Sequence, residues 1–133
     1  MSPVKQQFLK DGYLVLDRFK TPVECESLMQ RGAELAAGFD YSGHPSVFQT
    51  SEQTRTSDDY FLNSGGNISF FFEKDAFDAQ GNLKNDLFHS LNKIGHAMHD
   101  LDPVFNQFSR SPQLQALADA LNLDDYLLIQ SML

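Results

Sequence analysis

One stretch of the chain, residues 59–105, constrains the fold more than any other. Inside it Ile68, Phe70 and Phe72 recur at every second position. That spacing is the period of a β-strand, and it predicts a strand over residues 67–73 with one buried face. A glycine-containing turn at residues 79–82 follows and reverses or redirects the chain.

A helix is predicted after this turn, from about residue 85 to residue 100. Its apolar side chains recur at steps of four, three and four: Leu87, Leu91, Ile94 and Met98. Such steps place the four side chains on one helix face. Gly95 inside the pattern costs about 1 kcal/mol relative to alanine, and it indicates a close contact with another backbone.

Helix starts are signalled four times by a capping residue followed by proline. The four pairs are Ser2-Pro3, Thr21-Pro22, Asp102-Pro103 and Ser111-Pro112. Glu24 completes a capping box with Thr21. The predicted helices end at Gly12, about Gly38, just after Phe108 and at Asn122 respectively. Strands are predicted over residues 13–16 and 125–133, and Gly65-Gly66 is typical of a hairpin.

The composition excludes several classes of function. The 133 residues form one domain or part of one, and the formal net charge is −8. Such acidity disfavours nucleic-acid binding because phosphate backbones are repelled. No run reaches the roughly 18 apolar residues that a membrane span needs. The single cysteine, Cys25, cannot form an internal disulfide, so we expect a small buried side chain in a reducing compartment such as the cytoplasm.

The segment from residue 40 to residue 58 is polar and has no hydrophobic period. We expect a mobile or partly disordered loop there. A loop of this length inside a compact domain often acts as a lid or as one edge of a substrate site, and an ordinary surface loop is the alternative.

Bare spacing identifies no enzyme in this chain. His96, His99 and Asp100 would meet on one face of the predicted helix, where three such groups could hold a metal ion. A solvated helix face is the favoured interpretation, because these residues lie opposite the apolar stripe and near a helix C-terminus. Lys93 could hold an anion, although a surface lysine is the default.

Three blocks together carry a resemblance to a known family. They are FLKDGYLVLDRF at residues 8–19, TPVECESLMQR at residues 21–31, and residues 59–105 with FFFEK and NKIGHA. The first two blocks resemble the opening of phytanoyl-CoA dioxygenase (PhyH-like) proteins. The third narrows the resemblance to one branch of that family, and together the blocks span nearly the whole chain.

This resemblance implies an α+β chain that forms the N-terminal part of a double-stranded β-helix, a cupin-like jelly roll with flanking helices. It also implies an iron- and 2-oxoglutarate-dependent dioxygenase acting on an acyl-CoA or another small organic molecule. Family members hold Fe(II) through a His-x-Asp pair and a later histidine, the facial triad that leaves positions open for 2-oxoglutarate and O₂. A later arginine helps to bind 2-oxoglutarate.

This chain departs from that family pattern at the iron site. None of its four histidines is followed two residues later by aspartate. In the family the iron motif follows the strand that here closes with Met132. We therefore expect residues 1–133 to be the N-terminal part of one domain, truncated before the iron motif. The expectation includes no catalytic residue, no metal ligand and no bound cofactor in this chain alone, with Fe(II) and 2-oxoglutarate belonging to a full-length parent.

Two residues match family positions at the 2-oxoglutarate pocket. Met132 occupies one of them. His89 stands where relatives carry a lysine that contacts 2-oxoglutarate, and an imidazole is a weaker, pH-dependent partner for a carboxylate. Lys84 and Lys93 are alternatives for that role.

A second hypothesis is a non-catalytic short isoform or paralogue that acts by binding. The exposed end of the strand predicted over residues 127–132 would then need a partner, because an uncovered apolar edge invites association. The last three residues, Ser-Met-Leu, faintly resemble a peroxisomal ending, but the basic middle residue is absent. The oligomeric state has no sequence signal.

Overall fold

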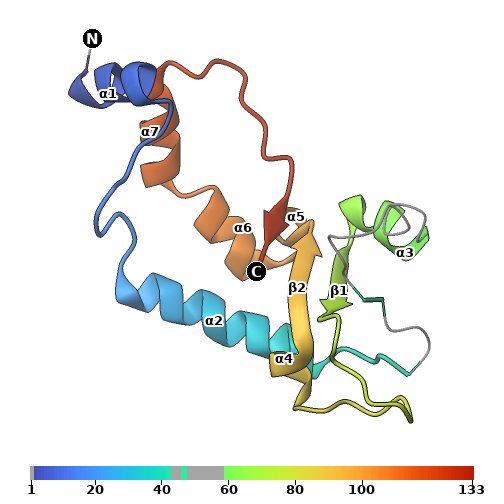
Figure 1. The fold of residues 1–133 in the computed structure, drawn as a ribbon. Helices are drawn as coiled ribbons and strands as arrows, with labels where there is room; N and C mark the ends of the chain where they lie inside the picture. Colours follow the sequence, from blue (N-terminus) through green and yellow to red (C-terminus); the bar gives the residue numbers. More distant parts are fainter. Residues whose placement is uncertain (1, 43–45, 48–58) are drawn as a thin grey trace.

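A computed structural model describes residues 2–42, 46–47 and 59–133 of the chain. Three strands form a small sheet, and the helices gather mainly to one side of it (Figure 1). The helices longer than one turn are α1 (Pro3–Asp11), α2 (Pro22–Ala37), α6 (Pro103–Ser109) and α7 (Pro112–Leu121). The short helical segments are α3 (Asp59–Leu62), the 3₁₀ turn η2 (Ser64–Gly66), α4 (Leu87–Ser90) and α5 (Met98–Leu101).

The sheet is antiparallel and has the order β1-β2-β3. Its strands are β1 (Ile68–Phe72), β2 (Leu91–His96) and β3 (Ser131–Met132). Strand β2 lies in the middle, with Phe70 opposite Ile94 on one side and Gly95 opposite Met132 on the other. The predicted strand at residues 67–73 is therefore confirmed.

The long helix predicted over residues 85–100 is wrong. This segment forms α4, then β2, then α5. Ile94 pairs with Phe70 of β1, and Gly95 pairs with Ser69 of β1 and Met132 of β3, partners that lie far away in the sequence. Apolar spacing alone cannot distinguish a buried strand between two short helices from one helix.

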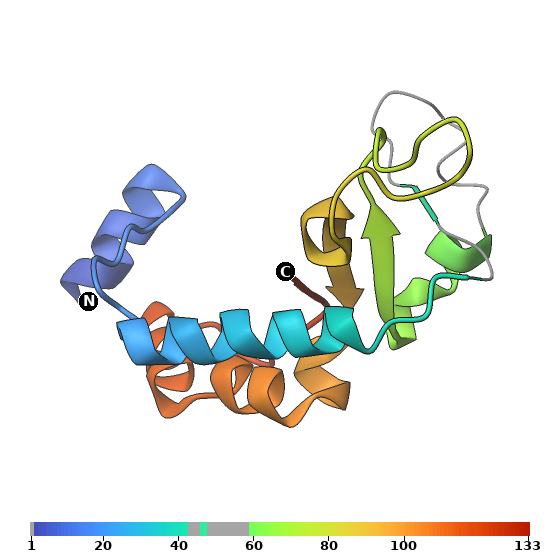
Figure 2. The ribbon, with the colours of Figure 1, turned by 90° about the horizontal axis from the view of Figure 1, so that it is seen from below.

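The hydrophobic core lies between α2 and one face of the sheet. It consists of Ala36, Phe70, Ile94, Met98 and Phe105, all buried. The ring of Phe39, just beyond α2, stacks on that of Phe70 with 4.2 Å between centroids. Viewed from below, α2 runs beneath the sheet alongside α6 (Figure 2).

The opposite face of β1 is also buried, so the prediction of a single buried face is wrong. Phe71 is 1% exposed. The rings of Tyr60 and Phe61, from α3, meet the ring of Phe71 edge-on at 5.5 and 5.7 Å. Helix α3 therefore covers the sheet face that points away from α2, a packing that the alternation in β1 does not encode.

The four predicted helix starts are confirmed. In α2 the Thr21 hydroxyl accepts the N–H of Glu24, and the Glu24 carboxylate accepts the N–H of Thr21, which completes the capping box. Asp102 caps α6 through its carboxylate, which accepts the N–H groups of Val104 and Phe105. The stops at Gly12 and Asn122 are confirmed as well, because both adopt the left-handed conformation (φ 78° and 56°) that ends a helix.

Four other expectations fail. Residues 13–16 form no strand, and Gly65-Gly66 belongs to η2 rather than to a hairpin turn. The strand predicted over residues 125–133 is reduced to β3, because residues 125–130 make no ladder with β2. Cys25 is exposed rather than buried, because it lies in the N-terminal half of α2, whereas the buried residues of that helix, Gly32 and Ala36, lie in its C-terminal half. Most of the loop predicted at residues 40–58 lies outside the described residues.

The mixture of helices with a small antiparallel sheet agrees with the predicted α+β class, and the jelly roll stays a prediction. None of the helices in the described part of the chain combines the length and apolar character of a membrane span.

Candidate functional site

The candidate site lies on the face of the sheet that points away from α2. In β2, Ile94 enters the core against α2, so its neighbour Lys93 lies on the other face. The Lys93 ammonium nitrogen is 4.9 Å from the centroid of the Phe71 ring and 5.0 Å from that of the Phe61 ring. These distances are typical of cation–π interactions, so the half-buried ammonium of Lys93 lies over the faces of two aromatic rings.

His96 shares this environment with Lys93. Its ring lies 5.7 Å from the ring of Phe71 and 6.0 Å from that of Phe61. The Ser64 hydroxyl donates to the carbonyl of Phe61 at 2.6 Å, so its oxygen is left to accept the Nδ1–H of His96 at 2.9 Å. The network therefore assigns the proton of neutral His96 to Nδ1 and leaves Nε2 as the acceptor.

Both basic side chains, Lys93 and His96, have a lowered pKa. Burial lowers the pKa of Lys93. Burial and then the nearby charge of Lys93 lower the pKa of His96, while its hydrogen bond with Ser64 acts in the opposite direction.

Met132 reaches the same face from β3. Leu133 packs toward α2, where a Cβ placed on Gly32 would lie 2.1 Å from its Cδ2 atom. The side chain of Met132 therefore lies on the opposite face, because neighbours in a strand alternate. A Cβ on Gly95 would lie 3.2 Å from the Met132 Cγ atom and 3.3 Å from the carbonyl oxygen of Ser131.

The close contact that the sequence predicted at Gly95 is thus confirmed, although it lies in a strand rather than a helix. We call Lys93, His96 and Met132 the cationic face. A pocket of about 150 Å³ opens beside Lys93. Its lining residues are Phe88, Leu91, Asn92, Lys93, Ile94 and Leu133.

His89, the other residue predicted for the 2-oxoglutarate pocket, lies on α4 and is exposed. Its Nδ1 atom is 2.7 Å from a carboxylate oxygen of Asp86, the residue that caps the same helix. Hydrogen bonds from the His89 side chain and backbone lower the pKa of Asp86. Lys84 is exposed as well. Of the three alternatives, Lys93 is the one that the structure brings to the face carrying Met132.

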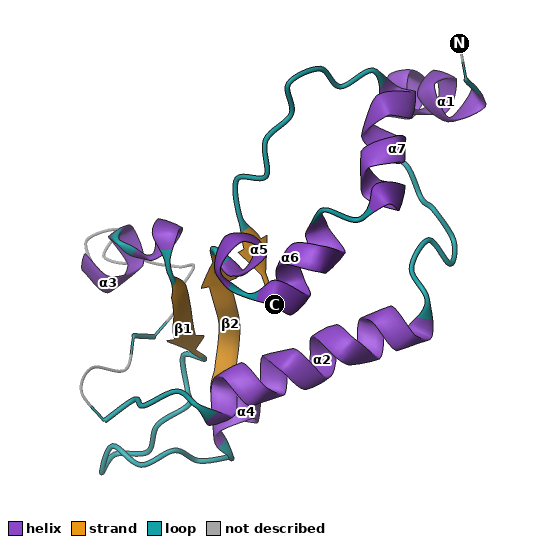
Figure 3. Cartoon of the chain, turned by 180° about the vertical axis from the view of Figure 1, so that it is seen from behind, coloured by secondary structure: helices purple, strands orange, loops and turns teal. Residues whose placement is uncertain are grey.

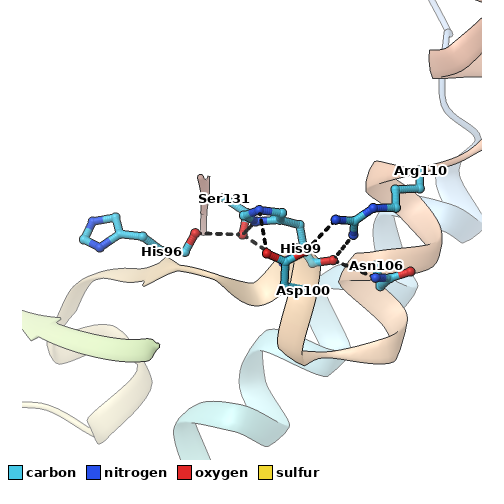
Figure 4. A network of polar contacts seen from close by, with 6 residues as sticks. All are labelled: His96, His99, Asp100, Asn106, Arg110 and Ser131. Atoms are coloured by element: carbon cyan, nitrogen blue, oxygen red, sulfur yellow. Dashed lines mark hydrogen bonds and ion pairs between the residues drawn. The ribbon is translucent and has the colours of Figure 1, made fainter. Parts of the chain in front are cut away.

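The histidines considered as metal ligands are held apart by other partners. His96 is bound to Ser64, whereas the Nδ1 atom of His99 lies 3.0 Å from the Ser131 hydroxyl and its Nε2 atom 3.4 Å from Asp100. Figure 4 shows the His96 ring directed away from that of His99. Within residues 2–42, 46–47 and 59–133, no three His, Cys, Asp or Glu side chains are grouped to hold a metal. The donor set there does not fit an iron ion.

Sequence reasoning missed His96 as a member of the cationic face. It was assigned to a helix, in which Lys93 and His96 would still be neighbours but Phe71 and Met132 would not contact them. The available signal was the glycine that precedes it, since Gly95 in a short apolar run favours a strand with a closely approaching neighbour.

Comparisons with known proteins agree on one family. The family model described as Phytanoyl-CoA dioxygenase (PhyH) matches residues 8–133. The phytanoyl-CoA dioxygenase domain-containing protein 1 of Bos taurus is 45% identical over 132 residues, which are 96% of this chain and 45% of that protein. The phytanoyl-CoA dioxygenase 1 of Oryza sativa is 43% identical over 125 residues, covering 94% and 44% respectively. The chain spans less than half the length of these curated relatives.

Proposed function

The chain belongs to the phytanoyl-CoA dioxygenase family, and from that premise we propose that it is the N-terminal portion of an iron- and 2-oxoglutarate-dependent dioxygenase domain. The observation that carries the proposal is the family match across residues 8–133. The substrate class we propose is an acyl-CoA or another small organic molecule. In such enzymes iron and 2-oxoglutarate together activate O₂, and the protein binds and orients them.

The role of this chain is to supply one wall of the 2-oxoglutarate pocket, the cationic face. The geometry that supports this role is a half-buried ammonium over two aromatic rings, on the sheet face that also carries the polarisable side chain of Met132. A carboxylate gains more from a partly buried ammonium than from an exposed one, because screening by water is weaker there. We therefore assign the 2-oxoglutarate contact to Lys93 in preference to His89 and Lys84.

The chain alone is proposed to be inactive. The His-x-Asp pair is missing from its sequence, and the described residues do not fit an iron ion. Measurement of iron-dependent succinate formation from 2-oxoglutarate tests this statement directly. We expect no turnover by the 133-residue chain, and clear activity would refute the proposed inactivity.

A hybrid protein tests the role of the cationic face. Residues 1–133 are fused to the part of the Bos taurus relative that follows its matched segment, and succinate formation is measured with Fe(II). Loss of a partly buried charged hydrogen bond costs about 1.5–3 kcal/mol, so Lys93→Ala should raise the KM for 2-oxoglutarate about tenfold or more. Lys84→Ala and His89→Ala are the matched controls and should leave this KM unchanged. A KM raised by His89→Ala and not by Lys93→Ala would reverse the assignment.

The exposed apolar segment that precedes β3 favours a second candidate function, a non-catalytic interaction protein. Leu127 and Ile129 are each 84% exposed. Strand β3 is also an edge strand, and edge strands next to apolar side chains promote association. Light scattering over a range of concentrations tests this candidate, and a stable monomer throughout would count against it. The exposed thiol of Cys25 supports a reducing compartment such as the cytoplasm for either function.

A further inference from the structure

The position of β3 depends on one hydroxyl group. The Ser131 oxygen accepts the backbone N–H of His99 at 3.1 Å and lies 3.0 Å from the Nδ1 atom of that residue. It also lies 3.4 Å from the carbonyl oxygen of His96. Figure 4 shows this hydroxyl directed into the turn between β2 and α5. Ser131 is the single hydroxyl-bearing residue among residues 127–133.

Strand β3 is also held by backbone hydrogen bonds and by the packing of Met132 on Gly95. Two backbone hydrogen bonds join Ile94 and Leu133, at 2.8 and 3.0 Å. Residues 125–130 before the strand are exposed. Met132 and Leu133 are both apolar, so a slip by one residue, which turns every side chain to the other face, would exchange one apolar side chain for another. Such a slip would point Met132 toward α2 and bring Leu133 to the cationic face.

The partner of Ser131 is rigid. His99 is 2% exposed, and its carbonyl oxygen accepts hydrogen bonds from the Asn106 amide at 2.8 Å and from the Arg110 guanidinium. Arg110 also binds the Asp100 carboxylate at 2.5 Å. These contacts tie His99 to helix α6, so the anchor of Ser131 does not move with β3.

The contact also completes a helix start. Helix α5 begins after Ala97, whose side chain cannot accept a hydrogen bond. The hydroxyl oxygen of Ser131, 32 residues further along the chain, accepts the N–H of His99 instead of a capping side chain. Because a helix start needs such an acceptor, the same hydroxyl stabilises α5 and fixes β3.

We propose that the Ser131–His99 contact is a latch that sets the register of β3 and thereby positions Met132 over Gly95 on the cationic face. Ser131 and His99 are thus positioning residues. The inference rests on the proposed function for the use made of Met132, whereas the latch itself is a property of this chain.

Two nearly isosteric variants of the 133-residue chain test the latch, Ser131→Thr and Ser131→Val. They differ in the hydroxyl group alone. Amide hydrogen exchange of Leu133 and Ile94 is measured, together with nuclear Overhauser contacts between the Met132 side chain and the Gly95 α-protons. We expect Ser131→Thr to keep wild-type protection and contacts. Ser131→Val should lose the contacts and at least tenfold of the protection, while amides in the β1–β2 ladder stay protected.

Equal behaviour of the two variants, with protection kept in both or lost in both, would overturn the latch. Ser27→Ala, at an exposed serine of α2, is the control for a serine substitution as such. The wild-type chain gives an independent measurement in case a variant fails to fold. If the latch holds β3, the amides of His99 and Leu133 open together and exchange with equal protection. A Leu133 amide that exchanges at least tenfold faster than that of His99 would contradict the proposal.

None of these measurements contains 2-oxoglutarate. Failure of the Lys93 experiment would therefore leave the latch standing, and failure of the latch would leave the assignment of Lys93 untouched.

Discussion

Removal of the Asp102 carboxylate should destabilise the fold through two separable contributions. Asp102 is 2% exposed and accepts the backbone N–H groups of Val104 and Phe105 at the start of α6. Its other oxygen binds the Arg31 guanidinium of α2 at 2.7 Å. One side chain therefore caps a helix and joins that helix to α2, across an interface next to the core.

The size of each contribution follows from these contacts. Loss of an N-cap costs about 1 kcal/mol. Breaking a buried ion pair costs about 3–5 kcal/mol, but Arg31 is partly exposed and keeps Glu34 at 3.0 Å, which reduces the penalty to about 2 kcal/mol. Asp102→Ala should thus lower the free energy of unfolding by about 3 kcal/mol. Asp102→Asn should lower it by about 2 kcal/mol, because asparagine caps as well as aspartate.

The ion-pair contribution should disappear in acid. Burial raises the pKa of Asp102. The Arg31 guanidinium and the two N–H groups together lower this pKa by more than burial raises it, so the pKa lies below its ordinary value of 3.8. A lowered folded-state pKa means that the stabilisation is complete above the unfolded-state pKa of about 3.9 and is lost as the pH falls through the folded-state value. The difference between wild type and Asp102→Asn should therefore be full at neutral pH and shrink below about pH 4.

Urea unfolding followed by far-ultraviolet circular dichroism measures all three proteins at several pH values. Glu34→Ala is the control, because it removes the exposed partner of Arg31 and should change the free energy of unfolding far less than Asp102→Ala. Equal losses for Asp102→Ala and Asp102→Asn would refute the capping contribution. A difference between wild type and Asp102→Asn that is independent of pH would refute the ion-pair contribution.

Two further substitutions have outcomes that the contacts determine. Thr21→Ala removes the hydroxyl half of the capping box of α2 and should lower the free energy of unfolding in urea by about 1 kcal/mol. Thr21→Ser keeps the hydroxyl and should lower it little. Equal losses in the two variants would mean that the cap does not stabilise the fold. Gly95→Ala places a methyl group 3.2 Å from the Met132 Cγ atom and 3.3 Å from a backbone oxygen of β3, so it should displace β3 and speed exchange of the Leu133 amide. Gly65→Ala is the control for that change, because a Cβ there meets nothing within 4 Å, and unchanged exchange in Gly95→Ala would contradict the tight packing.

The elements that sequence reasoning predicted correctly are those with local causes. Thr21-Pro22 with Glu24, and Asp102-Pro103, satisfy their own backbone N–H groups within one turn. Gly12 ends α1 because it adopts a left-handed conformation that costs glycine nothing. Each of these signals is complete within a few neighbouring residues, so no tertiary information is needed.

The errors lie where distant segments decide the structure. Leu91 and Ile94 fit a helix or a strand, and the backbone of Ile68–Phe72 selects the strand by pairing with it. Residues 13–16 and 125–130 have strand-like side chains but no neighbouring strand to pair with them. Strand propensity expresses fit to a sheet, so it cannot form a strand in the absence of a sheet edge.

The candidate site divides in the same way. Met132 was proposed from family resemblance and its role stays a prediction, while the structure places its side chain on the cationic face. The choice among His89, Lys84 and Lys93 depends on which side of the sheet each residue occupies. A segment predicted to be a helix says nothing about sides of a sheet, so the sequence could not decide between them. Once residues 91–96 form β2, alternation separates Lys93 from Ile94 and brings it onto Phe71.

Helix α1 stands apart from the rest of the fold. None of its residues is buried. It packs on α7 at the end remote from the sheet (Figure 3), where the Ser2 hydroxyl donates a hydrogen bond to the carbonyl oxygen of Ala120 at 3.3 Å. The connection to α2, residues 12–21, contains no buried residue either. Because none of its own residues is buried, we expect α1 to open and reclose at a small fraction of the global unfolding free energy. We therefore expect α1 to be a peripheral element that opens before the rest of the chain unfolds.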